Sequence, residues 1–190
     1  MISNIIKMLS ILVIALIPHM ESIESDRETL TESYAMTWES IELCNNSPIK
    51  SYEDGSMITD PTSMAYQVMS TLEIDERGHY IDTDGYIAMA LGNHYGSVGD
   101  RFRITLDTGV VIYAVMADTK ADVHMVNQCA HIGDGSMIEM IIDTETAGNY
   151  YGWGSNGYVL NGNYNNTEEF NGNIIKIEKE LNENEKSKIY

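Results

Sequence analysis

Hydrophobic and polar positions follow the period of β-strands from Tyr80 onward. Phe102, Ile104 and Leu106 alternate with polar neighbours, the pattern of a strand buried on one face. Residues 86–91 and 110–116 are apolar throughout, which is typical of central strands buried on both faces. The predicted strands are 86–91, 101–106, 110–116, 137–142 and 174–177.

The connections between these strands favour a mainly β fold. Asp107-Thr108-Gly109 predicts a hairpin between two of them. Short strands with Gly-rich turns and no internal repeat indicate a small barrel or sandwich rather than βαβ units. Residues 148–172 are rich in Gly, Asn and Tyr and predict a surface loop.

The preceding segment has a helical period instead. Ser25-Asp26-Arg27-Glu28 fits a capping box at the start of a helix. A stripe of apolar residues at spacings of three, four and seven predicts that this helix ends near Leu43. Its members are Ile23, Leu30, Tyr34, Trp38 and Ile41. Residues 44–60 are rich in turn formers and predict a linker.

The extreme N-terminus matches an export signal. Lys7 precedes ten mostly apolar residues, 8–17, closed by Pro18, a length that suits a signal peptide better than a membrane span of about twenty residues. No clear cleavage site of small residues follows, so an uncleaved membrane tether and a buried core helix stay open as alternatives. We therefore expect a secreted or membrane-tethered extracellular protein.

These patterns divide the chain of 190 residues, which is long enough for one well-buried core. Residues 1–22 are the predicted signal peptide or tether, and 23–60 an acidic helical and linker region. Residues 61–178 form the predicted β-barrel domain, and 179–190 a charged tail.

The charge of the chain argues against nucleic acid as a partner. The formal net charge is −18, and residues 21–84 carry fifteen acidic and three basic side chains. A phosphate backbone is bound through Lys and Arg, which displace its counterions. Most of the carboxylates are explained by solubility alone.

The two cysteines, Cys44 and Cys129, form neither a CxxC pair nor a zinc-type cluster. In an oxidising compartment they could pair with each other, which the sequence alone does not decide. The sequence indicates no cofactor.

Residues 87–143 resemble the double-psi β-barrel of the RlpA-like and 3D-domain cell-wall proteins. The resemblance rests on Ile87-Ala88-Met89-Ala90-Leu91-Gly92, Val98-Gly99-Asp100-Arg101-Phe102, Ala117-Asp118-Thr119 and Gly135-Ser136-Met137-Ile138-Glu139. It implies a six-stranded barrel whose two acids, here Asp118 and Glu139, line a groove that holds peptidoglycan glycan. In the lytic transglycosylases of these families one such acid serves as acid and base. Lys120 stands where the families have Gly, and Glu139 where they have Asp.

A second resemblance, to uncharacterised proteins of Firmicutes and their phages, rests on the Ala-Asp-x-Lys-Ala-Asp-x-His pattern of residues 117–124. It implies no function.

Asp118 and Glu139 also stand out on chemical grounds. Glycosidic cleavage needs a carboxylic acid whose pKa is raised by desolvation or by a neighbouring carboxylate. Asp118 follows a buried strand, where burial raises a carboxyl pKa. Glu139 is the one charge in 137–142, on the face predicted for Met137 and Ile141, and needs a partner or a purpose there. The alternatives are a turn-capping Asp118 and a solvent-facing Glu139.

Further residues are candidates for binding. Thr119, Lys120 and Asp122 adjoin the catalytic candidate, and Tyr151 and Trp153 could stack on sugar rings, although aromatics in such loops more often anchor the loop to the core. Asp122, His124 and His131 are weak metal candidates. For these the alternative is a surface ion pair between Lys120 and Asp122 beside two solvent-facing histidines. Asp82-Thr83-Asp84-Gly85 predicts a turn rather than a calcium loop.

Three functions remain open. The first is peptidoglycan cleavage of the lytic-transglycosylase type, with Asp118 as acid and Glu139 tuning it. The second is a non-catalytic module that binds glycan or protein through the segment 148–172. The third is a structural or virion component, since a fold does not fix a function.

Overall fold

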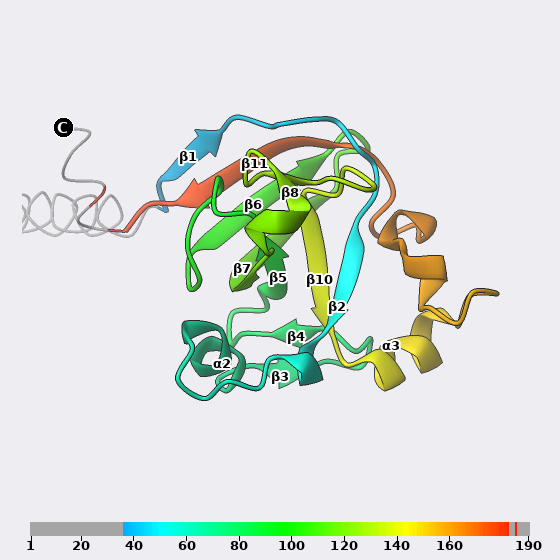
Figure 1. The fold of residues 1–190 in the computed structure, drawn as a ribbon. Helices are drawn as coiled ribbons and strands as arrows, with labels where there is room; N and C mark the ends of the chain where they lie inside the picture. The colour runs from blue at the N-terminus through cyan, green and yellow to red at the C-terminus, as the bar shows by residue number, and fades with distance from the viewer. Residues whose placement is uncertain (1–35, 183–184, 186–190) are drawn as a thin grey trace, which may run out of the picture. The chain divides into compact units, whose positions relative to one another are not determined.

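The computed structural model describes residues 36–182 and 185 of the chain (Figure 1). The chain divides into two compact units, 1–37 and 38–190, and residues 36 and 37 are the described part of the first. The predicted leader, the capping box and the stripe residues before Met36 lie outside the described residues. Among residues 36–182 and 185, no helix combines the length and apolar character needed to cross a membrane.

Within the described residues, nine strands form one mixed sheet (Figure 1). Its order is β1-β11-β6-β7-β5-β10-β2, with β3 and β4 attached beside β5. The strands are β1 (Trp38–Ile41), β2 (Ser51–Asp54), β3 (Glu73–Ile74), β4 (Tyr80–Ile81), β5 (Ile87–Leu91), β6 (Arg101–Leu106), β7 (Val111–Thr119), β10 (Ile138–Ile142) and β11 (Ile174–Glu180). A separate hairpin pairs β8 (Met125–Val126) with β9 (Ala130–His131).

Short helices and turns complete the described residues. They are η1 (Gly55–Met57), α2 (Met64–Met69), η2 (Asp122–His124), α3 (Thr144–Tyr151), η3 (Leu160–Gly162) and η4 (Tyr164–Asn166).

The mainly β prediction is confirmed, whereas the predicted strand count of six is not. The strand order ends at β1 and β2, and no pairing between these two closes a barrel in the described part of the chain. Of the additional strands of the sheet, β1 and β2 come from regions predicted as helix and linker, and β3 and β4 are two-residue strands too short to show hydrophobic periodicity.

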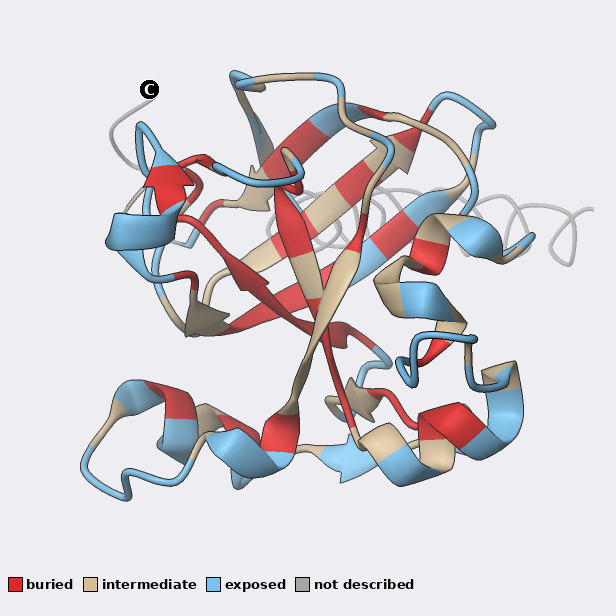
Figure 2. Cartoon of the chain, turned by 45° about the vertical axis from the view of Figure 1, so that its right-hand side comes forward, coloured by how far each residue is buried: buried red, intermediate tan, exposed pale blue. Residues whose placement is uncertain are grey.

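The strands predicted from periodicity are present, but the prediction that 110–116 is buried on both faces is wrong for the start of β7, where Val111 and Tyr113 are 43% and 44% exposed. β6 alternates between partly and fully buried positions. β5 is buried along its whole length, because its two faces pack into different apolar clusters (Figure 2). Ile87, Met89 and Leu91 belong to the main core, whereas Ala88 and Ala90 face a smaller cluster that includes Met69 of α2.

Two elements correct the predictions for residues 23–60. The predicted helix does not reach Leu43, because β1 pairs antiparallel with β11, where Ile41 lies opposite Ile177. The predicted linker contains β2, which pairs parallel with β10. In both places the backbone hydrogen bonds offered by a neighbouring strand outweigh local preference.

The segment 148–172 is less irregular than predicted. α3 covers its beginning, with the Asp143 side chain capping the helix through the Thr146 N–H. Tyr164 and Phe170 are buried in the main core and anchor the segment. This agrees with the alternative prediction that aromatic residues of the segment attach it to the core. At the C-terminal end, β11 continues to Glu180 and Leu181 is buried, so the sheet extends past the predicted start of the tail.

Cys44 and Cys129 form a disulfide across 85 residues, with Cα atoms 6.1 Å apart. The pairing that the sequence left open is therefore present. It ties the connection between β1 and β2 to the loop before β9.

Candidate functional site

Polar side chains from three strands, β7, β10 and β2, lie in a row on one face of the sheet, with an alanine of β5 between them. Asp118 of β7 lies opposite Ala90 of β5, Ala90 opposite Glu139 of β10, and Glu139 opposite Ser51 of β2. Residues opposite one another in paired strands project to the same face. Glu53, two residues after Ser51, projects to that face as well. Asp118, Glu139 and Glu53 therefore project to the same face, with the small side chain of Ala90 between the first two.

A β-bulge determines that Asp118 belongs to this row. Met89 lies opposite Met116, but the register then shifts, and Ala90 lies opposite Asp118 rather than Ala117. A bulge of this kind inserts one residue and re-aims the side chains that follow it. Without the shift, the carboxylate of Asp118 would project to the opposite face.

Lys120 supplies the positive charge of the site. Its side chain is 2% exposed, and its Nζ lies 3.3 Å from Glu139 Oε1. The same Nζ donates hydrogen bonds of 3.0 Å to the carbonyl oxygen and the Oγ of Ser136. Ser51 Oγ donates to Glu139 Oε1 at 3.0 Å. Glu139 thus has the partner that its position in an apolar strand requires.

The predicted surface pair between Lys120 and Asp122 is wrong, because Lys120 turns inward to Glu139. Asp122 instead accepts hydrogen bonds from Asn93 at 3.1 Å and from Gln128 at 3.0 Å. Asp122 therefore lies outside the row of carboxylates.

Glu53 is the most perturbed acid of the group. Its pKa is raised from 4.5 to about 7, chiefly by burial and then by the negative charges of Asp118, Glu139 and Asp54, while Lys120 acts in the opposite direction. The pKa of Asp118 is also raised, by burial first and by Glu139 after it, although the Thr119 N–H donates to Asp118 Oδ1 at 2.8 Å. Partly buried carboxylates that share one face and raise one another's proton affinity favour keeping a proton in the cluster near neutral pH.

Sequence reasoning missed Glu53 because it lies in the segment read as a linker. The signal was the tetrapeptide Ser51-Tyr52-Glu53-Asp54, which is too short and too polar to be recognised as a strand. Only its parallel pairing with β10 brings it beside Glu139.

The weak metal candidates do not assemble into a site. The His124 and His131 rings are 6.3 Å apart, and His131 Nδ1 lies 3.1 Å from Asp134 Oδ1. Among the described residues, no three His, Cys, Asp or Glu side chains are grouped as a metal site would require. The Asp82 turn is held by Arg101, which contacts Asp82 and Asp84 at 2.5 and 2.6 Å.

Tyr151 and Trp153 differ in what they contact. The Tyr151 side chain packs against the main core. Its hydroxyl lies 2.9 Å from His79 Nε2 and donates to Glu169 at 3.1 Å. Trp153 is 53% exposed, as are its neighbours Tyr150 at 56% and Tyr158 at 59%. Tyr151 is thus an anchor, and the exposed aromatic surface consists of Tyr150, Trp153 and Tyr158.

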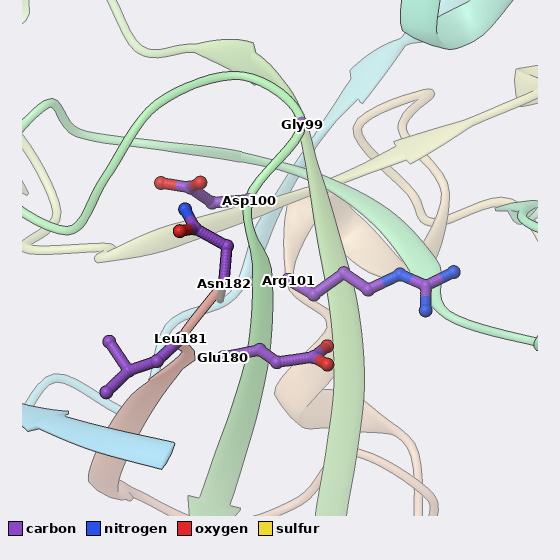
Figure 3. A pocket seen from close by; sticks show the side chains of 6 residues that line it. All are labelled: Gly99, Asp100, Arg101, Glu180, Leu181 and Asn182. Atoms are coloured by element: carbon purple, nitrogen blue, oxygen red, sulfur yellow. The ribbon is translucent and has the colours of Figure 1, made fainter. Parts of the chain in front are cut away.

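A hollow of about 170 Å³ lies elsewhere, between the start of β6 and the end of β11 (Figure 3). Its lining consists of Gly99, Asp100, Arg101, Glu180, Leu181 and Asn182. None of the predicted site residues lines it, and the Arg101 side chain extends away from Asp100 and Asn182 toward the Asp82 turn.

Comparison with known proteins gives no assignment. No protein-family model matches the chain, and no curated protein matches it either.

Proposed function

We propose that the chain is an exported cell-wall protein and that Glu53, Asp118 and Glu139 cleave peptidoglycan glycan by the lytic-transglycosylase route. The observation that carries this proposal is the position of three carboxylates on one face of the sheet, one of them paired with Lys120, with the pKa of Glu53 raised to about 7. The resemblance to RlpA-like and 3D-domain proteins and the apolar N-terminus supply the substrate class and the location.

The fold is part of this proposal. In the described sheet, the pairs β5–β7 and β10–β2 are parallel and the remaining pairs antiparallel. Two parallel pairs, each formed by strands that are not consecutive in the chain, support kinship with a double-psi β-barrel. The catalytic candidates lie on these two pairs.

The chemistry follows from the proton balance of the cluster. A group with a pKa of about 7 is protonated in roughly half of the molecules at neutral pH, so Glu53 can donate a proton to the leaving glycosidic oxygen. The C6 hydroxyl of the same sugar then attacks C1, and its proton passes to the carboxylate that has just lost one. No water is consumed. Glu139, fixed by Lys120 and Ser51, raises the proton affinity of its neighbours and is not itself the donor.

The test uses purified full-length protein and insoluble cell-wall sacculi, with soluble anhydro-sugar fragments as the readout. We expect Glu53→Gln and Asp118→Asn each to lower fragment release by about 100-fold or more, the usual contribution of a general acid. Glu73→Gln in β3 and Asp122→Asn are matched controls, because both carboxylates are exposed and lie outside the cluster. Undiminished release by both cluster variants would exclude this mechanism.

A non-catalytic glycan-binding module is the second candidate, favoured by the exposed aromatic surface of Tyr150, Trp153 and Tyr158. Aromatic rings with one free face offer stacking area to sugar rings. In this case the protein would sediment with sacculi without releasing fragments, and Trp153→Ala would abolish sedimentation. Tyr66→Ala, which removes an aromatic side chain that is 40% exposed on α2, is the control.

A further inference from the structure

The two cysteines of the disulfide differ in exposure. Cys44 is exposed in the connection between β1 and β2, whereas Cys129 is 1% exposed and belongs to the main core. Both line a hollow of about 300 Å³, together with Glu42, Leu43, His94 and Asn127. A thiol entering this hollow therefore meets Cys44 first.

The hydroxyl group of Tyr95 lies within hydrogen-bonding distance of both disulfide sulfurs. Tyr95 Oη lies 3.2 Å from Cys44 Sγ and 3.2 Å from Cys129 Sγ. Disulfide sulfurs carry no hydrogen, so the hydroxyl is the donor in either contact. Tyr95 is 2% exposed, and burial raises its pKa to about 12, which keeps the hydroxyl protonated. A donor at this position can stabilise a thiolate formed at either sulfur.

We propose that Cys44–Cys129 is a thiol-exchange site, at which a small-molecule thiol attacks Cys44 and releases Cys129 as the leaving thiolate. The incoming thiolate forms a bond to Cys44 Sγ, the bond between Cys44 and Cys129 breaks, and its electron pair remains on Cys129 Sγ, where Tyr95 donates a hydrogen bond. A second thiol then attacks the mixed disulfide, frees Cys44 and leaves with the first as an oxidised pair.

Exchange has a defined structural consequence. Residues 42–50 are held to the segment 129–136 by this disulfide, by Asn45 Nδ2 donating to the Gly135 carbonyl at 2.9 Å and by Ser47 Oγ donating to the Asp134 carbonyl at 3.1 Å. Once the disulfide opens, hydrogen bonds that each contribute about 1 kcal/mol hold this connection. Its backbone should then open more often than the strands of the central sheet.

The first experiment locates the adduct. The oxidised full-length protein is exposed briefly to 2-mercaptoethanol, quenched with acid, alkylated and mapped by peptide mass spectrometry. We expect the mercaptoethanol adduct on Cys44 and the alkyl group on Cys129. An adduct on Cys129, or a disulfide that stays closed until the whole protein unfolds, would overturn the proposal.

The second experiment tests the donor. Tyr95→Phe should slow reduction by about tenfold, the rate equivalent of one charge-assisted hydrogen bond. Tyr113→Phe, at a residue 44% exposed on β7, is the matched control and should leave the rate unchanged. Hydrogen exchange of the reduced wild-type protein should accelerate at 42–50 and not in β5 or β7. Equal exchange in oxidised and reduced protein would contradict the release of this connection, and this measurement needs no variant.

Discussion

Lys120 Nζ lies 3.3 Å from Glu139 Oε1, and this pair joins the end of β7 to β10 across the intervening strand β5. The ammonium group is buried and its three donors are used, one toward Glu139 and two toward Ser136. The positive charge thereby compensates one of the three neighbouring carboxylates. The pKa values of the other two carboxyl groups, Glu53 and Asp118, are raised, in both cases by burial first.

Removing this ammonium group should destabilise the fold. We expect Lys120→Met to lower the free energy of unfolding by about 2–4 kcal/mol, because Glu139 and Ser136 lose a buried partner. Urea denaturation at pH 7 measures it, with Lys176→Met as the control, since that lysine is exposed and should contribute less than about 1 kcal/mol. A double-mutant cycle with Glu139→Gln should give a coupling energy of about 1–3 kcal/mol, and a coupling near zero would contradict the pair.

Glu53 should make stability decrease as the pH rises through about 7. Its pKa is raised from 4.5 to about 7 in the folded protein, so between these values the folded state binds more protons than the unfolded state. Its stabilising contribution is complete below pH 4.5 and is lost through pH 7. With allowance for solvent screening, we expect a loss of about 1–2 kcal/mol between pH 6 and 8. Urea titrations of Glu53→Gln should lack this component, and an unchanged slope would refute the assignment.

His79 should make stability decrease as the pH falls, the opposite of the effect of Glu53. Burial lowers its pKa from 6.5 to about 4, with Asp75 raising it and Arg77 lowering it in turn. The unfolded state therefore binds the proton first, and stability is lost as the pH falls from 6.5 to 4. Because Glu53 opposes this trend in part of the range, the measurement belongs in the Glu53→Gln background. There His79→Gln should flatten the dependence on pH between 6.5 and 4, and a retained slope would assign it to other groups.

Alanine substitutions at two glycines should distinguish the stability cost of a steric clash from that of an unfavourable backbone conformation. Gly78 and Gly85 both have positive φ, 85° and 83°. A Cβ on Gly78 would lie 2.4 Å from the backbone nitrogen of Ala147, whereas one on Gly85 would meet nothing within 4 Å. Gly85→Ala should therefore cost about 1 kcal/mol, the conformational term alone, and Gly78→Ala about 3 kcal/mol or more. Thermal and urea unfolding of the two variants compare them, and equal costs would contradict the close approach of α3 to Gly78.

The strands that could be predicted were those with a strong local pattern. β6 was recognisable from alternation and β5 and β7 from continuous apolar character, because each buries its own side chains in a regular way. β1 and β2 were not, because neither has a repeating pattern of burial. They are strands because β11 and β10 offer them unpaired backbone groups.

Likewise, only part of the candidate site could be predicted from the sequence. Asp118 and Glu139 were identifiable because a carboxylate at the end of, or inside, an apolar strand is costly without a purpose. Glu53 was not, because nothing in its neighbourhood in the chain distinguishes it from the other acids of a chain with a net charge of −18. Lys120 was predicted to adjoin Asp118, but the ion pair suggested for it was with Asp122, whereas the structure pairs it with Glu139.

By itself the sequence determined the mainly β character, the central strands and the two strand-borne acids, because the burial of a strand and the desolvation of a charge are set by adjacent residues. The tertiary structure decided which residues face one another. The parallel pairing of β10 with β2, the bulge at Ala117 and the inward turn of Lys120 are long-range outcomes of register and packing. No local pattern contains them, since a one-residue shift in pairing moves every side chain of a strand to the other face.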